Sequence, residues 1–532
     1  MIRDLHLLAT AAAEACAATT DAAEKKSWGQ YFTSVEVAGF MGSLVAVGAA
    51  TAPIRVLDPG AGTGILGLAA AAALLARGAE AVRLTAIEAH PGARAHLHES
   101  LRLAREASAG RLDAKVIGAD FLDLAPPGLD ASLSSEPFDV VIANPPYFKL
   151  SPRDRRGGDA PNIYARFMEI SAGLLRERGQ LLFIVPRSFA SGRYFERFRR
   201  AFHRRMSLHR VHVFESRRDP FKAHGVLQEN IIVDYRKATR APSSVTITSS
   251  RGARDLDRPT KVEASRRLLL PDHAPHAVLR LPTCDEDLAL LARLERWRDD
   301  LGSYGLAVST GPVVPFRATD QLVHTASAAT APLLWMQHVR AGRVTWPLGA
   351  GFRKPEHIMR SAPSKLLVTN RTYVLLRRIS AKEDRRRLTA AVLHAGALPG
   401  DVLGLENHLN FIHRPGGEID QNEATALAAL LSSSLFDRYI RMVSGSTQIN
   451  ATELRTLPLP PRPDVIELGR QLLRRPELAQ QTQLDELMRS LTGANTNPHA
   501  TSPGAAPHAP SQPPRETAHA ARRRVSDAHR GG

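Results

Sequence analysis

The feature that most constrains the fold is a regular alternation, over the first half of the chain, of short apolar segments with longer helical ones. Apolar segments end near 57 and recur at 83–90, 114–121 and 138–143, and helical periodicity occupies 65–78 and 91–108. A further helix is predicted over 163–179 and a strand over 179–186, and the pattern continues to about 235. Strands that alternate with helices form a parallel sheet covered by helices, so the sequence predicts an α/β fold.

The length of 532 residues exceeds one typical domain, and 43% apolar residues are enough for large cores. The composition becomes rich in Ser, Thr, Arg and Pro after 241, and after 495 it has too few apolar residues to order a tail. The predicted organisation is an N-terminal helix at 1–28, an α/β domain at 29–240, a variable join at 241–280, a second domain of mixed structure at 281–465, a C-terminal helix at 466–494 and a disordered tail at 495–532.

The chain carries a formal net charge of +17, which favours a polyanionic partner because each neutralised phosphate releases a counterion. Nucleic acid fits this charge best, and the alternative is a basic tail on an ordinary enzyme. Cys16 and Cys284 are the only cysteines, which excludes a disulfide framework and is typical of a reducing cytoplasm. The histidines lack metal-like spacing, so no metal is predicted. No stretch approaches the ~18 consecutive apolar residues of a membrane span.

A glycine-rich loop follows the first predicted strand. The strand ends at Asp58, and Gly60, Gly62 and Gly64 precede the next helix, which lets the backbone approach a ligand closely. The G-x-G-x-G spacing differs from the G-x-G-x-x-G spacing of pyrophosphate binders. Glu88 ends the second strand, at the place where a carboxylate accepts the two ribose hydroxyls of a nucleoside. Loop and acid favour an adenosyl cofactor over the alternative, a structural turn with a surface acid.

The sequence Asn144-Pro145-Pro146-Tyr147 directly follows the fourth predicted strand. It suits attack by the exocyclic amine of adenine, a poor nucleophile whose two hydrogens need acceptors. The Asn144 carboxamide oxygen and the Pro145 carbonyl are the candidate acceptors, the prolines fix the turn, and Tyr147 offers a ring for the base to stack on. The alternative interpretation is a purely structural loop stiffened by prolines, and the glycine loop upstream argues against it.

The order of the segments GQYFTSVEVAGFM (29–41), LDPGAGTG (57–64), AIEAH (86–90), GADF (118–121) and IANPPY (142–147) resembles the gamma-type adenine-N6 DNA methyltransferases of bacterial type II restriction-modification systems, among them the XhoI/PstI-like modification methylases. The resemblance extends to about 460. It implies S-adenosyl-L-methionine as cofactor, a Rossmann-like catalytic domain, a C-terminal target-recognition domain, double-stranded DNA as substrate and a cognate restriction endonuclease as genetic partner. It also implies a monomer in the bacterial cytoplasm.

The resemblance also assigns site residues. The segment 29–33 would cap the methionine end of the cofactor, with Tyr31 and Thr33 in contact, although Ser34 replaces the usual proline. Asp120 would receive the cofactor's adenine amino group, and Phe121 would pack on that adenine.

A second aromatic ring is implied against the flipped base, and we expect it at Phe221, with Phe214 as the runner-up. Either ring can instead be core. For target recognition the expected segments are Val308 to Arg317 and those around Arg340, Asn407, Gln448 and Asn450.

Two rival functions use related features. RNA-adenine and protein-glutamine methyltransferases share the Asn-Pro-Pro-Tyr chemistry but generally lack a long basic second domain. A non-catalytic DNA-binding specificity subunit would keep the fold as a scaffold, against which the intact Asn144 and glycine loop argue. The arginine-rich segment 193–206 has phenylalanines on one helical face, so we expect a helix packed on the sheet rather than a DNA-binding stripe.

Overall fold

The computed structural model describes residues 2–19, 33–46, 53–124, 133, 136–147, 160–215, 229–238, 240–271, 277–349, 351–380, 383–445 and 447–491. Tyr31, Phe221 and the predicted tail at 495–532 lie outside these residues. The described part of the chain falls within one compact unit, Met1–Gly493.

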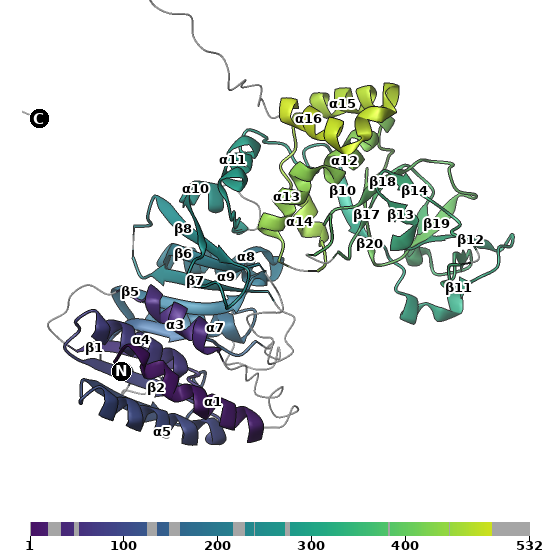
Figure 1. Cartoon of the computed structure of the whole chain (residues 1–532). Coiled ribbons are helices and arrows are strands. Elements are labelled where there is room, and N and C mark those ends of the chain that lie inside the picture. The colour runs from purple at the N-terminus through teal and green to yellow at the C-terminus, as the bar shows by residue number, and fades with distance from the viewer. Residues whose placement is uncertain are drawn as a thin grey trace, which may run out of the picture. The chain divides into compact units, whose positions relative to one another are not determined.

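The first half of the chain is built on a nine-stranded sheet with the strand order β3-β2-β1-β4-β5-β7-β6-β8-β9 (Figure 1). Its strands are β1 (Ile54–Pro59), β2 (Val82–Ile87), β3 (Leu112–Ile117), β4 (Phe138–Ala143), β5 (Leu175–Pro186), β6 (Ser207–Phe214), β7 (Asn230–Arg236), β8 (Ser244–Ser250) and β9 (Thr260–Ser265). The α/β fold predicted from the alternation of strands and helices is confirmed.

The strands from β3 to β5 are parallel, and β7 lies antiparallel between β5 and β6. The chain builds outward from β1 through β2 to β3 and then returns to the other side of β1 with β4. The loops after β1 and β4 therefore diverge at the carboxyl edge of the sheet. Such a switch point is where parallel α/β sheets bind their ligands.

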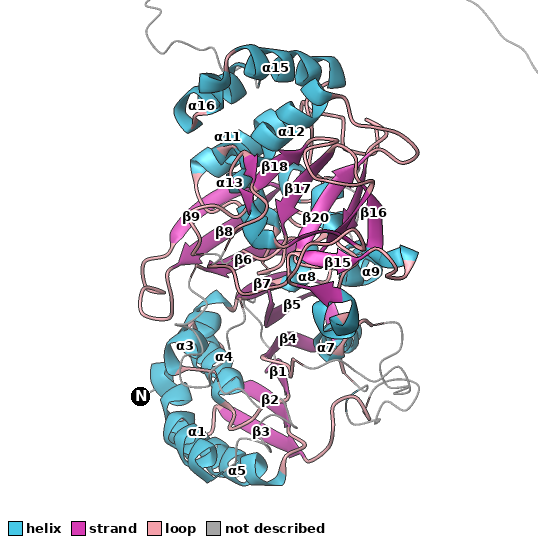
Figure 2. Cartoon of the chain, turned by 90° about the vertical axis from the view of Figure 1, so that its right-hand side faces the viewer, coloured by secondary structure: helices cyan, strands magenta, loops and turns pink. Residues whose placement is uncertain are grey.

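Helices cover both faces of this sheet, as Figure 2 shows. One face carries η1 (Ile2–Leu7), α1 (Leu8–Thr19), α3 (Val35–Leu44), α4 (Ile65–Ala76) and α5 (Pro91–Ala107), and the other carries α7 (Ile163–Leu174), α8 (Ser188–Ser191), η3 (Arg193–Phe195) and α9 (Glu196–Arg205). Alternate strand residues enter the two cores: Val140 packs on the first face and Val141 on the second. This burial of both faces explains the nearly continuous apolar strands.

The structure differs from the sequence prediction at the start of β5. The helix expected to run to 179 ends at Leu174, and a strand begins at Leu175. Two backbone features account for this. Arg178 has a φ of +63°, which an α-helix cannot contain, and its N–H donates to the carbonyl of Lys237 beyond β7. Pairing with a distant strand therefore overrides the helical propensity of residues 175–178.

The segment 241–280, expected to form a variable join, contains β8 and β9, which continue the sheet. β8 lies parallel to β6, and β9 is antiparallel to β8. Five of the seven residues of β8 are Ser or Thr, so its composition resembles that of a loop, while the backbone hydrogen bonds of both strands are those of a sheet edge.

The second half of the chain is mixed in structure, as expected. Its sheets have the orders β10-β20-β17-β18, β11-β15-β12-β19-β16 and β13-β14. The strands are β10 (Ala307–Thr310), β11 (Leu322–Val323), β12 (Thr330–Leu334), β13 (Val339–Arg340), β14 (Arg343–Val344), β15 (His357–Met359), β16 (Leu367–Thr369), β17 (Tyr373–Arg377), β18 (Ala390–Leu393), β19 (Val402–Leu405) and β20 (Leu409–His413).

The helices of this half are α10 (Arg266–Leu269), α11 (Asp285–Leu294), α12 (Gln421–Ser432), α13 (Ser434–Val443), α14 (Ala451–Arg455), α15 (Arg462–Arg474) and α16 (Gln481–Leu491), with the short 3-10 turns η6 (Pro315–Arg317), η7 (Thr319–Gln321), η8 (Met336–His338), η9 (Ser364–Leu366) and η10 (Pro476–Ala479). Of these, α11 to α16 share a core with the β10-β20-β17-β18 sheet. None of the helices in the described ranges combines the length and the apolarity needed to cross a bilayer.

Candidate active site

The predicted cofactor and catalytic residues come from the carboxyl ends of neighbouring strands. Asp58 lies in β1, Glu88 follows β2, Asp120 follows β3 and Asn144 follows β4. These four strands are adjacent and parallel, in the order β3-β2-β1-β4. Residues as far apart in sequence as 58 and 144 therefore meet at one edge of the sheet.

The glycine loop between β1 and α4 adopts a backbone that favours glycine at three positions. Gly60, Gly62 and Gly64 have φ values of +77°, +56° and +91°. A Cβ at Gly64 would lie 2.8 Å from Cδ1 of Leu97 on α5, so that glycine also permits close helix packing. The loop is tied to β2, because the N–H groups of Gly60 and Ala61 both donate to the carbonyl of Ile87, at 2.8 and 2.9 Å.

The Glu88 carboxylate holds this loop to the start of α5. Its Oε2 accepts from the N–H of Gly62 at 2.7 Å, and its Oε1 accepts from the N–H of His90 at 2.8 Å. Burial raises the pKa of Glu88, and these two N–H groups oppose that rise. Each carboxylate oxygen has two lone pairs, so Glu88 can still accept from the hydroxyls of a bound ribose.

Asp58 lies deeper than Glu88 and anchors the helix that follows the loop. It is 1% exposed, and its Oδ2 accepts from the N–H of Gly67 in the first turn of α4 at 2.8 Å. Burial raises the pKa of Asp58 to about 7, the Gly67 N–H lowers it, and the nearby Glu88 charge raises it further. Its Oδ1 is buried without a hydrogen-bond partner in the described structure, so this carboxylate retains an acceptor beside the loop.

Asp120 and Phe121 form the turn after β3. Oδ1 of Asp120 accepts from the N–H of Leu122 at 2.9 Å. Phe121 is 2% exposed, and its ring centroid lies 4.9 Å from that of Phe167 on α7. Phe167 also lies beside the glycine loop, 3.5 Å from where a Cβ of Gly60 would be. No local pattern pointed to Phe167 as a site residue, because its helical periodicity indicates only core packing.

The Asn144 side chain is held by Thr33, from the segment before α3. Its Nδ2 donates to Oγ1 of Thr33 at 3.1 Å, and Thr33 is 6% exposed. The two residues are 111 positions apart in sequence. Because the amide nitrogen is engaged by Thr33, the orientation of the carboxamide is fixed, with Oδ1 as its acceptor end.

Tyr147 contacts the same carboxamide from the other side. Its hydroxyl lies within hydrogen-bond distance of both Oδ1 of Asn144 and the carbonyl of Ile184 in β5, the latter at 3.1 Å. Since a phenol has one proton, it donates to one of these at a time. Burial and the neighbouring Tyr164 raise the pKa of Tyr147 well above its usual value, so the phenol stays neutral. The two rings meet edge to face, 6.2 Å apart.

Phe214, the alternative ring for the base, lies at the end of β6 and is 0% exposed. It packs edge to face on His212, with the ring centroids 4.7 Å apart. It therefore belongs to the core on the α4 side of the sheet.

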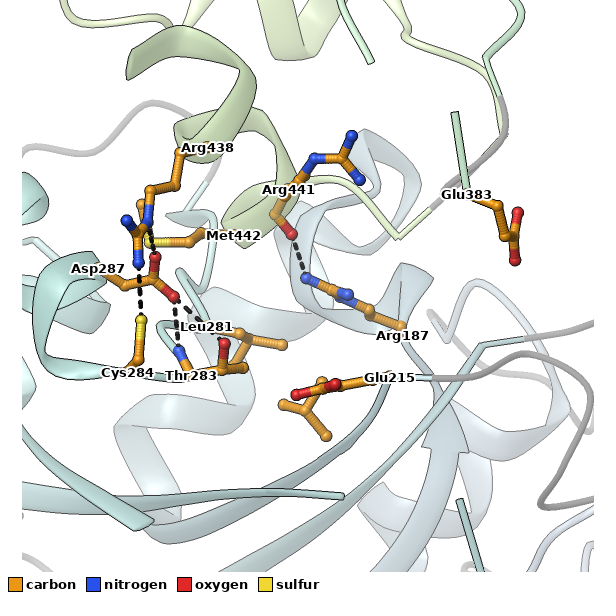
Figure 3. Close-up of a pocket in the computed structure, with 11 residues that line it drawn as sticks. Arg187, Glu215, Leu281, Thr283, Cys284, Asp287, Glu383, Arg438, Arg441 and Met442 are labelled. Carbon is orange, nitrogen blue, oxygen red and sulfur yellow. Dashed lines mark hydrogen bonds and ion pairs between the residues drawn. The ribbon is translucent and has the colours of Figure 1, made fainter. Parts of the chain in front are cut away.

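A polar cavity of about 450 Å³ lies beyond the ends of β5 and β6, lined also by α11 and α13 (Figure 3). Arg187 crosses one side of it, donating to Oε2 of Glu229 at 3.2 Å and to the carbonyl of Arg441. On the other side, Arg438 donates to Asp287 and to Sγ of Cys284. None of the predicted cofactor residues that the structure describes lines this cavity, so it is separate from the glycine loop.

Two of the residues expected to read DNA, Asn407 and Gln448, lie close together. Arg378, which directly follows β17 and was not predicted, donates to Oε1 of Gln448 and to the carbonyl of Asn407, both at 3.1 Å. Asn450 instead begins α14, where its N–H donates to Glu453 at 2.9 Å. Phe316, within the expected segment 308–317, is 75% exposed.

Comparison with known proteins shows which family the chain resembles. Residues 108–221 match the Eco57I restriction-modification methylase family. The type II methyltransferase M.PstI of Providencia stuartii is 31% identical over 478 residues, which cover 88% of this chain and 94% of that protein. The type II methyltransferase M.BsuBI of Bacillus subtilis is 30% identical over 480 residues, with the same coverage of 88% and 94%.

Among solved structures, the Type IIL restriction-modification enzyme MmeI in complex with DNA aligns with a TM-score of 0.53 at 10% identity, over 86% of this chain and 71% of that chain. At this identity the likeness concerns the fold. The strand order, the glycine loop and the Asn-Pro-Pro-Tyr turn thus define a methyltransferase with a Rossmann-like sheet. More specifically, the chain belongs to the type II methyltransferases of restriction-modification systems, as the order of its motifs indicated.

Proposed function

We propose that the protein transfers a methyl group from S-adenosyl-L-methionine to N6 of adenine within a short recognition sequence of double-stranded DNA. The observation that carries this proposal is the Asn144 carboxamide at the carboxyl end of β4, oriented by Thr33 and adjacent to the glycine loop after β1. Methylation of that sequence would protect the DNA from a cognate restriction endonuclease.

The carboxyl edge of the sheet suits a nucleoside cofactor. Gly60, Gly62 and Gly64 leave room beside the backbone, Glu88 offers acceptors for the ribose, and Asp120 is the proposed acceptor for the adenine amine. We propose that Tyr31 and Thr33 contact the methionine end and that Phe121 packs near the adenine. When bound, S-adenosyl-L-methionine supplies an electrophilic methyl group on a sulfonium.

The chain's own residues would prepare the target amine. Adenine N6 is a weak nucleophile because its lone pair is conjugated with the ring. Oδ1 of Asn144 and the carbonyl of Pro145 would accept its two hydrogens, which favours a tetrahedral nitrogen and directs the lone pair toward the methyl group. Pro146 keeps the turn rigid, and Tyr147 and Phe221 would flank the flipped base. The hydroxyl of Tyr147 would then donate to Ile184, freeing Oδ1 for the substrate.

Duplex DNA fits the charge and the domain organisation. The net charge is +17, and the relative MmeI was solved with DNA. We propose that the nine-stranded sheet and the helices packed on it form the catalytic domain, which extends beyond the predicted range 29–240 to the end of β9. We propose that 281–465 select the target sequence, with Arg378, Gln448 and Asn407 as a recognition cluster. The protein would act as a monomer in the bacterial cytoplasm.

The test is to express the chain and its Asn144→Ala variant in a host that lacks DNA methylation and to read the host DNA by long-read sequencing. The expected result is N6-methyladenine at one short sequence in the first sample and a loss of about 100- to 1,000-fold of the activity in the second, which is what removal of one transition-state hydrogen-bonding group costs. Methyl transfer to RNA or to a protein glutamine, with no modified DNA, would contradict the proposal. Retained binding of S-adenosyl-L-methionine by Asn144→Ala shows that the variant is folded.

A further inference from the structure

The helix α9 carries an exposed row of arginines that the proposed chemistry does not use. Its apolar side is packed as expected, because Phe195, Phe198 and Phe202 are at most 5% exposed. The opposite side and the turn before it are solvent-exposed and carry Arg193, Arg197, Arg200, Arg204 and Arg205. Glu196 is the acidic residue within this segment, and it pairs with Arg200 at 3.2 Å.

This basic face begins at the edge of the sheet that carries Asn144. β5 is parallel to β4, so residues 187–194 leave the sheet at its carboxyl edge, whereas α9 leads to β6, which starts at the opposite edge. Rings connect the catalytic turn to the start of the face. Tyr147 meets Tyr164 at 6.2 Å, Tyr164 stacks on Phe195 at 5.3 Å, and Phe195 meets Tyr194 at 5.5 Å.

Tyr194 and Arg193 are presented on a rigid turn. Tyr194 is 55% exposed, one of few large apolar side chains with so much exposure among the described residues. The buried guanidinium of Arg199 donates to the carbonyls of Phe189 and Gly192, at 2.8 and 2.9 Å. These bonds fix the turn that precedes Arg193 and Tyr194. Because this surface is already ordered, binding of a ligand to it costs little conformational entropy.

We propose that Arg193, Tyr194 and the exposed arginines of α9, together the α9 basic face, bind the sugar-phosphate backbone of duplex DNA beside the target adenine. The inference rests on the proposed function. Arginine and tyrosine are typical phosphate contacts, which position a protein on DNA without reading its sequence. Arg197 to Arg204 span about 10 Å at 1.5 Å per residue, which is comparable with about three successive phosphates of one strand.

The test is the salt dependence of duplex binding. Arg197→Gln/Arg204→Gln is compared with Arg474→Gln/Arg475→Gln, which removes the same two positive charges from exposed positions at the end of α15. Binding of a mixed-sequence duplex is measured by fluorescence anisotropy over a range of KCl concentrations. The α9 pair is expected to weaken binding on the order of tenfold per lost contact at about 0.1 M salt and to reduce the slope of log K against log[salt] by about 0.9 per contact.

The rate of methyl transfer and a Tyr194 variant test the inference further. The rate of methyl transfer at saturating DNA and cofactor should be within about twofold of the unmodified chain, since phosphate contacts act on binding. Tyr194→Ala is expected to weaken binding with an unchanged salt slope, because a phenol displaces no counterion. An α9 pair with the parental slope, or equal losses in the two arginine pairs, would overturn the inference, whereas failure of the unmodified chain to bind or methylate any duplex would overturn the proposed function itself.

Discussion

The hydrogen bond from Nδ2 of Asn144 to Oγ1 of Thr33 should affect the rate of methyl transfer separately from cofactor binding. Thr33→Val keeps the shape of the side chain and removes the acceptor, which lies 3.1 Å from Nδ2. A neutral hydrogen bond is worth about 1 kcal/mol net, so the carboxamide loses about that much of its preference for the productive orientation. If Oδ1 acts only when oriented, the rate constant for methyl transfer falls about fivefold.

The assay is single-turnover methyl transfer with enzyme in excess over a duplex oligonucleotide and cofactor at saturation. Calorimetry gives the Kd of the cofactor for the same variants. If Thr33 serves only the cofactor, Thr33→Val raises that Kd and leaves the saturated rate constant unchanged. Thr33→Ser keeps the hydroxyl and should retain most of the rate. A parental rate constant for Thr33→Val, or equal losses for Val and Ser, would refute the reasoning.

Two stability predictions follow from buried charges. Arg187→Met removes the ion pair with Glu229, whose side chain is 1% exposed, and should reduce the free energy of unfolding by about 3–5 kcal/mol. Arg187→Met/Glu229→Gln should recover part of that loss in urea titrations, and a double variant as unstable as the single one would contradict this. Asp58 has a pKa of about 7 when folded against 3.8 in its ordinary state, so the folded chain binds more protons and becomes less stable as pH rises between these values. The stability of Asp58→Asn relative to the parent should therefore increase from about pH 4 to about pH 8, and a constant difference would exclude burial as the cause.

The local part of the fold was predictable from the sequence because each element buries its own face. The alternation from β1 to β4, with α4 and α5 between, needs only local apolar periodicity and the glycines that end each segment. The end of α7 and the start of β5 were not predictable in this way, because they depend on the hydrogen bond between Arg178 and Lys237, which are far apart in the sequence. The same holds for β8 and β9, because β8 forms a strand on the edge that β6 offers and β9 then pairs with β8.

The candidate site was predictable to a similar degree. Glu88 and Asn144 follow strands, and the fold places both at the carboxyl edge of the sheet. The bond between Thr33 and Asn144, and the ring of Phe167 beside Gly60, depend on tertiary packing between distant segments. No spacing in the sequence encodes such contacts.

The way Glu88 holds the glycine loop has a consequence for cofactor binding. Its two carboxylate oxygens already accept from the backbone N–H groups of Gly62 in the loop and of His90 at the start of α5. The loop thus reaches its ligand-ready shape during folding, and little conformational entropy remains to be lost on association. A cofactor that binds this loop as proposed would therefore need little rearrangement of the backbone.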